Sequence, residues 1–216
     1  MKFGVFIGLL LLVSSCVSAQ PFAKEIAEFK TRDSAQFPPK HAILFIGSSS
    51  FTKWKDVQDY FPGYTIVNRG FGGSTLLDQI RYVNDIVFPY KPKQVVIYCG
   101  ENDVASSDTI TAQTVYDRFV ELFTLIRKKL PKVPIAFVSL KPSPSREKFG
   151  PTVVETNRLI RAFISGKKKA AFIDVYSPML DEAGKYKEEL FLEDRLHMKK
   201  EGYVIWKEAI EPYLKK

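Results

Sequence analysis

Short apolar runs alternate with amphipathic stretches along most of the chain. Five runs of four to six residues are largely apolar, and they span residues 42–46, 64–67, 94–99, 135–140 and 170–174. Such runs predict strands that are buried on both faces of a sheet. A break at residues 37–40, which holds two prolines, separates the first of them from a helical pattern over residues 21–31.

The stretches between the runs predict helices. Residues 112–130 place five large apolar side chains on one helical face and three basic side chains in the last turn, where cations interact favourably with the helix dipole. The apolar set is Val115, Phe119, Leu122, Phe123 and Ile126. Similar patterns cover residues 75–87, 152–164 and 203–214. Strands that alternate with helices predict crossover connections, and hence an α/β fold with a parallel sheet covered on both faces.

The first nineteen residues follow a different pattern. Lys2 precedes a largely apolar run to Val13, and small residues follow as far as Ala19. This is typical of a secretory signal peptide, and the run is short for a membrane-spanning helix. Two processing schemes stay open, because cleavage after Ala19 suits a general signal peptidase, whereas residues 13–16 resemble a lipoprotein box with a lipid anchor at Cys16. We expect an exported protein, either periplasmic, extracellular or lipoprotein-anchored, without a membrane span.

Charge and cysteine content narrow the classes of partner. The chain has 32 basic and 24 acidic residues, a net charge of +8, but the basic residues are scattered, and tight clusters occur at 167–169, 199–200 and 215–216. A nucleic-acid groove interleaves basic and aromatic residues, which this chain does not do, so we expect no nucleic-acid partner. If cleavage follows Ala19, Cys99 is left alone and should be a small buried residue.

Polar loops follow the predicted strands where catalytic chemistry usually lies in parallel sheets. These loops are residues 47–50, 68–73, 100–103 and 194–197. Together they hold a serine, glycines, an asparagine and an Asp-x-x-His pair. Acyl transfer needs a serine with a base, a carboxylate that orients the base, and fixed donors for the oxyanion, so the set suits that reaction.

The Asp-x-x-His pair carries specific information. A separation of three residues lets the carboxylate of Asp194 reach one imidazole nitrogen of His197 within a single turn and leaves the other nitrogen facing the serine. The chain has two histidines, and His41 precedes the first predicted strand, at its amino end. His197 is therefore the expected base.

The four loops resemble, in order, the signature blocks of the SGNH (GDSL-type) hydrolases. The resemblance implies that Ser49 is the nucleophile and that Asp194 orients His197. It also implies an oxyanion hole formed by the backbone N–H groups of Ser49 and Gly73 and by the side-chain amide of Asn102. One position departs from the family pattern, because Ser48 stands where the family usually has aspartate before the nucleophile.

The resemblance extends over residues 43–203. It implies a flavodoxin-like three-layer α/β/α sandwich around a five-stranded, mainly parallel sheet. With the patterns above, it divides the chain into a signal peptide (1–19), a lead-in arm (20–40) and an SGNH hydrolase domain (41–216). No cofactor is expected.

Other enzyme classes fit the sequence less well. An α/β-hydrolase would need Gly-x-Ser-x-Gly, but no second glycine follows the serines after Gly47. A metal site would need more histidine and cysteine than the mature chain offers, and no phosphate-binding glycine motif occurs. We expect an esterase that acts on a small-molecule or glycan ester with a short acyl group, such as an acetylated carbohydrate. An O-acyltransferase and a non-catalytic glycan-binding module stay open, as does a role for Phe71, Tyr98 and residues 141–146 as walls of the acyl or sugar site.

Overall fold

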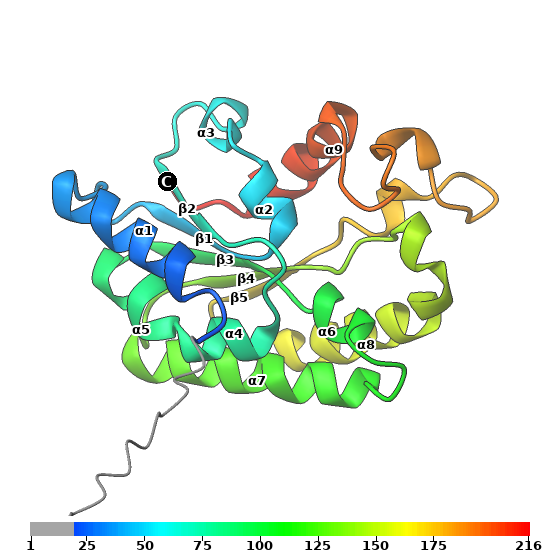
Figure 1. Ribbon diagram of the computed structural model, residues 1–216, viewed down its shortest axis with the longest axis horizontal. Helices are drawn as coiled ribbons and strands as arrows, with labels where there is room; N and C mark the ends of the chain where they lie inside the picture. The colour runs from blue at the N-terminus through cyan, green and yellow to red at the C-terminus, as the bar shows by residue number, and fades with distance from the viewer. Residues whose placement is uncertain (1–19) are drawn as a thin grey trace, which may run out of the picture.

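The computed structural model describes residues 20–216, so the predicted signal segment at 1–19 lies outside the described residues. Five parallel strands form one sheet in the order β2-β1-β3-β4-β5 (Figure 1). They are β1 (Ile43–Gly47), β2 (Ile66–Gly70), β3 (Gln94–Tyr98), β4 (Ile135–Val138) and β5 (Ala170–Ile173). This strand order is the flavodoxin-like one, which confirms the predicted fold class.

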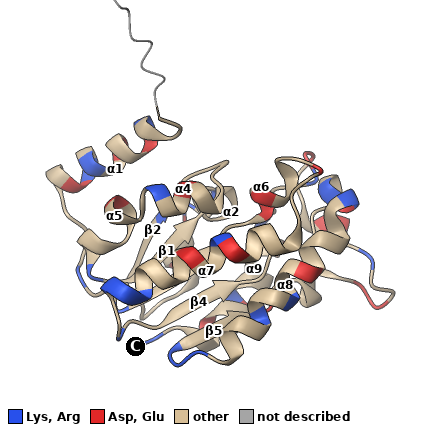
Figure 2. Ribbon diagram, turned by 90° about the horizontal axis from the view of Figure 1, so that it is seen from below, with Lys and Arg blue, Asp and Glu red and all other residues tan. Residues whose placement is uncertain are grey.

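Helices cover both faces of the sheet. One face carries α4 (Leu76–Arg81), α5 (Val83–Ile86), α7 (Ala112–Lys129) and α8 (Gly150–Ser165), and the other carries α2 (Ser49–Lys53), α3 (Val57–Tyr60) and α9 (Lys200–Ile210) (Figure 1). The arm helix α1 (Ala23–Ala35) packs beside α5, and α6 (Glu101–Ala105) follows β3. Basic and acidic residues are interspersed over the helices in Figure 2, as the scattered charge of the sequence predicts. Within residues 20–216, no helix is both long enough and apolar enough to cross a membrane.

The amphipathic helix predicted at 112–130 is confirmed as α7. All five of its predicted apolar residues are buried, and it packs between α4 and α8. The Thr111 side chain accepts a hydrogen bond from the Thr114 backbone N–H at 3.2 Å, which satisfies one of the N–H groups that a helix start leaves without a partner.

Three of the differences between the predicted elements and the structure have a clear physical cause. The helix expected at 75–87 is split into α4 and α5, because Tyr82 leaves helical geometry (φ −102°, ψ 10°) while its hydroxyl donates to the Pro21 carbonyl at 2.6 Å. Strand β2 runs past 67 to Gly70, since the polar side chain of Asn68 is satisfied inside the fold by the Phe51 carbonyl at 2.7 Å. The last helix spans 200–210, and a 3₁₀ turn with Pro212 replaces the rest of the predicted helix.

Aromatic packing fixes α2 against α9 above the sheet. The Trp54 ring lies 4.9 Å from that of Tyr203 and the Phe51 ring 6.0 Å from that of Trp206, measured between centroids. The Tyr203 hydroxyl also donates to the Ser50 carbonyl at 2.9 Å. The segment that enters α9 is thereby held over the start of α2, at the carboxyl end of β1.

Candidate active site

Ser49 is the first residue of α2 and comes just after the end of β1. The turn between them needs glycine at position 47, where φ is +144° and a Cβ atom would lie 1.9 Å from the Tyr98 carbonyl oxygen. The Ser48 backbone N–H then donates to that same carbonyl at 3.0 Å. The chain therefore turns sharply at the sheet edge and presents the Ser49 hydroxyl beyond it.

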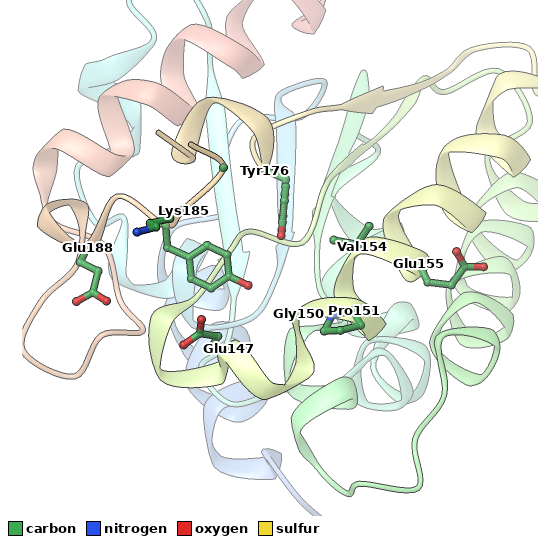
Figure 3. A pocket seen from close by; sticks show the side chains of 10 residues that line it. Glu147, Gly150, Pro151, Val154, Glu155, Tyr176, Lys185 and Glu188 are labelled. Atoms are coloured by element: carbon green, nitrogen blue, oxygen red, sulfur yellow. The ribbon is translucent and has the colours of Figure 1, made fainter. Parts of the chain in front are cut away.

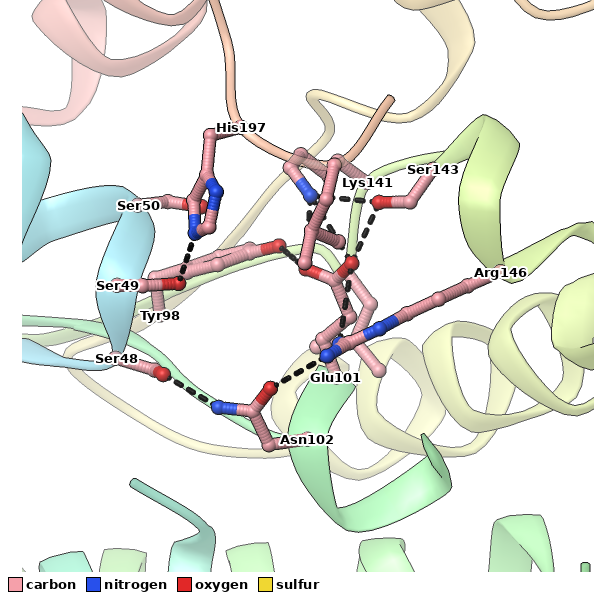
Figure 4. A network of polar contacts seen from close by, with 12 residues as sticks. Ser48, Ser49, Ser50, Tyr98, Glu101, Asn102, Lys141, Ser143, Arg146 and His197 are labelled. Carbon is pink, nitrogen blue, oxygen red and sulfur yellow. Dashed lines mark hydrogen bonds and ion pairs between the residues drawn. The ribbon is translucent and has the colours of Figure 1, made fainter. Parts of the chain in front are cut away.

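His197 meets Ser49 from the segment before α9. Its Nε2 lies 3.0 Å from the Ser49 Oγ (Figure 4), and its Nδ1 lies 2.5 Å from Oδ2 of Asp194. An imidazole held in this way can take a proton from the serine through one nitrogen while the carboxylate fixes the other. The structure thus brings together the three residues predicted to act as nucleophile, base and acid.

A tight turn holds Asp194 under the imidazole. Its Oδ1 accepts hydrogen bonds from the backbone N–H groups of Leu196 at 3.0 Å and His197 at 2.9 Å, with Arg195 in the left-handed region at φ 53°. Burial acts to raise the pKa of Asp194, but the hydrogen bonds from the His197 ring and from these two N–H groups outweigh it and hold the pKa well below its usual range. Asp194 is therefore an anion at neutral pH.

The three groups predicted to form the oxyanion hole differ in their present hydrogen bonds. Among the described residues, 20–216, no acceptor binds the backbone N–H of Ser49 or that of Gly73, which has a φ of +83°. The Asn102 amide nitrogen donates to the Ser48 hydroxyl at 2.7 Å and to the Ser74 carbonyl at 3.0 Å. Asn102 thus lies beside the turn that carries Ser49, and the two predicted backbone donors are unengaged.

The structure adds a buried polar cluster behind Asn102 that the sequence patterns did not predict. Glu101 lies at its centre, with Lys141 Nζ at 2.9 and 3.0 Å, the Ser143 hydroxyl at 2.5 Å and the Tyr98 hydroxyl at 2.6 Å (Figure 4). Arg146 approaches the same carboxylate at 3.4 Å. Burial raises the pKa of Glu101, but Lys141 and Arg146 outweigh that effect and lower it, so the carboxylate is ionised.

The expectation that Phe71, Tyr98 and residues 141–146 line the site was largely wrong. Phe71, Tyr98 and Lys141 are each 1% exposed, because the aromatic rings belong to the core and the lysine to the cluster around Glu101. Of the side chains in that cluster, Arg146 is the one that solvent partly reaches, at 21%.

A cleft of about 810 Å³ opens beside this region (Figure 3). It is lined by the aromatic and apolar side chains of Tyr176, Tyr186, Pro151 and Val154, with Glu147, Glu155, Lys185 and Glu188 around them. Glu188 pairs with Arg195 at 2.6 Å, so the cleft borders the turn that carries Asp194. It offers apolar faces and hydrogen-bonding groups, and none of the residues predicted for the catalytic site lines it.

Two further groups of side chains were candidates for chemistry, the possible metal ligands and the cysteine thiol. Within residues 20–216, no group of three or more His, Cys, Asp or Glu side chains could hold a metal ion. Cys99 is fully buried, as predicted, and burial raises the pKa of its thiol well above the usual value. Cys99 is therefore a core residue and not a nucleophile.

A family model described as the GDSL-like Lipase/Acylhydrolase family matches residues 46–205. That match covers most of the chain and includes every residue of the predicted site. The chain belongs to the GDSL-like lipase/acylhydrolase family. Membership confirms the resemblance stated above. Among curated proteins, none showed significant similarity to this family member.

Solved structures confirm the fold of this family. A Streptococcus pneumoniae protein whose name refers to platelet activating factor superposes with a TM-score of 0.77 at 20% identity, covering 89% of this chain and 92% of its own. A GDSL-like lipase from Bacteroides thetaiotaomicron gives 0.72 at 22% identity, covering 87% and 95%. An acetylxylan esterase from Geobacillus stearothermophilus gives 0.65 at 16% identity, covering 82% and 94%.

Proposed function

We propose that this protein is an exported serine esterase that hydrolyses carboxylic esters of short acyl groups through an acyl-enzyme on Ser49. The observation that carries the proposal is the Ser49 Oγ at 3.0 Å from Nε2 of a histidine whose Nδ1 faces an ionised aspartate. Family membership supports acyl hydrolysis as the reaction, and the geometry supports Ser49, His197 and Asp194 as the residues that carry it.

In this mechanism His197 removes the Ser49 proton as Oγ attacks the ester carbonyl. The resulting oxyanion is bound by the Ser49 and Gly73 backbone N–H groups, which have no other acceptor in the described chain. Asn102 supplies the third donor by turning toward the oxyanion the N–H that it now gives to the Ser48 hydroxyl. His197 then protonates the departing alcohol, and water, activated by the same imidazole, releases the acid from Ser49.

A short acyl group on a carbohydrate is the substrate class that we propose. The cleft beside the turn of Asp194 combines two tyrosine rings with carboxylates, a combination that suits the apolar faces and the hydroxyl groups of a sugar. The similarity in fold to an acetylxylan esterase supports the same choice.

A substrate panel tests this proposal. Purified protein, with Ser49→Ala as its control, would be assayed on nitrophenyl esters from acetyl to palmitoyl and on acetylated xylo-oligosaccharides. We expect the highest kcat/KM for the acetyl ester, acetate release from the oligosaccharides, and neither activity in Ser49→Ala. Preference for palmitoyl would contradict the substrate class. Acyl transfer to a free sugar in place of release to water would favour the acyltransferase, and glycan binding without turnover would favour the binding module.

We propose export because residues 1–19 have the sequence pattern of a signal peptide. Expression of the whole chain in a bacterium, followed by fractionation and intact mass measurement, tests it. A mature chain that begins at Gln20 supports simple secretion, whereas a lipid-modified chain that begins at Cys16, and is lost in Cys16→Ala, supports anchoring. An unprocessed chain in the cytoplasm would contradict both.

A further inference from the structure

Arg146 contacts Asn102 of the predicted oxyanion hole. It comes from the loop after β4, which holds none of the predicted catalytic or oxyanion-hole residues. It lies in the 3₁₀ segment η2 (Pro144–Phe149), where its own backbone (φ −120°, ψ 23°) departs from helical geometry. Its Nη2 donates to the Asn102 Oδ1 at 2.9 Å, and its Nη1 lies 3.4 Å from the Glu101 carboxylate (Figure 4).

These contacts decide which way the Asn102 amide points. A guanidinium group can only donate hydrogen bonds, so it requires the oxygen end of the amide. The Ser74 carbonyl can only accept, so it requires the nitrogen end, which it meets at 3.0 Å. A flipped amide would set two donors against each other at Arg146 and two acceptors against each other at Ser74.

We propose that Arg146 is a positioning residue for ester hydrolysis, which holds the Asn102 amide with its nitrogen toward the oxyanion and polarises that amide as a donor. The inference rests on the proposed function. A cation bound to the amide oxygen draws electron density from the N–H groups, and hydrogen bonds in such chains strengthen one another. Arginine suits this role because its charge is permanent.

The buried cluster holds Arg146 in place. Its partner Glu101 is itself fixed by Lys141 and by Ser143, both of them buried. The adjacent Ser145 backbone N–H donates to the Arg195 carbonyl at 3.0 Å, in the turn between Asp194 and His197. The loop after β4 thus links the oxyanion side to the acid–base side. Arg146 keeps the nitrogen end of the amide beside Ser48, so that only the N–H now given to the Ser48 hydroxyl has to change its acceptor during the reaction.

A double-mutant cycle tests the proposal with nitrophenyl acetate. We expect Arg146→Met to lower kcat by roughly ten- to a hundredfold, somewhat less than the loss of an oxyanion donor, with KM nearly unchanged. In an Asn102→Ala background the same substitution should change kcat by less than about threefold, because Arg146 acts through that amide.

Arg146→Lys, which keeps the charge, should recover part of the activity, as should added guanidinium ions with Arg146→Met. Arg158→Met, which alters an exposed arginine paired with Glu155 on α8, is the matched control and should leave kcat unchanged.

Two kinetic results would overturn the role. Losses that multiply in the double variant would show that Arg146 acts independently of Asn102. A raised KM at unchanged kcat would make it a substrate contact. If Arg146→Met does not fold, Arg146→Lys enters the same cycle with the same criterion.

A spectroscopic measurement separates this inference from the proposed function. The chain has four asparagines, so labelling asparagine with nitrogen-15 gives few side-chain amide signals. Arg146→Met should shift the Asn102 pair and leave that of exposed Asn84 in place, whereas Arg158→Met should shift neither. An unmoved Asn102 pair would overturn the inference even if no ester is cleaved. A shifted pair would support the positioning role whatever the reaction is.

Discussion

The acid–base side of the site lies at the surface and is formed by one turn, whereas the oxyanion side is backed by buried groups from distant segments. The side chain of Asp194 is 47% exposed, and its hydrogen bonds end within three residues of it. The side chain of Glu101 is 9% exposed, and its partner Lys141 is 40 residues away. The first arrangement depends on local backbone geometry and the second on the packing of the domain, so the two should respond differently to substitution.

Removal of the base, His197, should lower kcat more than any other substitution considered below. We expect His197→Ala to lower kcat on the order of 10⁵- to 10⁶-fold, the size seen when a nucleophile–base pair is broken, with the fold intact because the residue lies on a surface turn. Steady-state kinetics and circular dichroism check this. His41→Ala, at the amino end of β1, is the matched control. Full activity in His197→Ala would eliminate the mechanism, because no other histidine is placed to replace it.

Asp194→Asn should have the second largest effect on kcat. The amide keeps the shape of the turn but can no longer act as an anion beside Nδ1, and we expect kcat to fall by roughly 10³-fold, somewhat below the loss at buried triads because this carboxylate is half exposed. Because the pKa of Asp194 lies well below its usual range, the wild-type carboxylate stays ionised at neutral and alkaline pH, and any loss of activity on acidification within that range does not come from Asp194. Glu193→Gln is the neighbouring control. A fall in kcat of less than tenfold would show that Asp194 has a minor role and would point to a backbone carbonyl as the partner of His197.

Asn102→Ala tests the buried side directly. We expect kcat to fall on the order of 10²- to 10³-fold with little change in KM, since one oxyanion donor acts mainly in the transition state. Asn84→Ala, which alters an exposed asparagine between the two short helices, should have no effect. An unchanged kcat for Asn102→Ala would leave Asn102 as a structural residue that starts α6.

The buried cluster should matter more for stability than for rate. Lys141→Met leaves Glu101 with one cation fewer in a buried site, and we expect a loss of about 3–5 kcal/mol in the free energy of unfolding. Because the folded pKa of Glu101 lies below the unfolded value of 4.5, its contribution is present above that value and is lost as pH falls through the folded pKa. Urea unfolding at neutral and acidic pH measures both effects, and the Lys141→Met variant should lose less stability on acidification than the wild type does. Wild-type stability at neutral pH in Lys141→Met would show that the pair is dispensable.

The same contrast explains what the sequence could predict. Strands buried on both faces and the helix at 112–130 show periodicities that need no knowledge of the fold. The Asp-x-x-His turn is also local. Polar residues inside β2 and the break at Tyr82 were missed, because each depends on a partner from another segment.

The cluster around Glu101 was missed for a related reason. Its charges come from the loops after β3 and β4, and one charged residue in a loop indicates nothing by itself. Because these two strands are neighbours in the sheet, their loops meet at the same edge. An acidic residue beside Asn102 and two basic residues in the next loop were therefore a usable signal once the strand order was known.

We propose Ser49, and neither of the serines beside it, as the nucleophile. Labelling with a fluorophosphonate, followed by peptide mass spectrometry, tests it most directly. We expect one adduct, on Ser49, that is absent in Ser49→Ala and strongly reduced in His197→Ala. An adduct on Ser48 or Ser50, or undiminished labelling of Ser49→Ala, would contradict it.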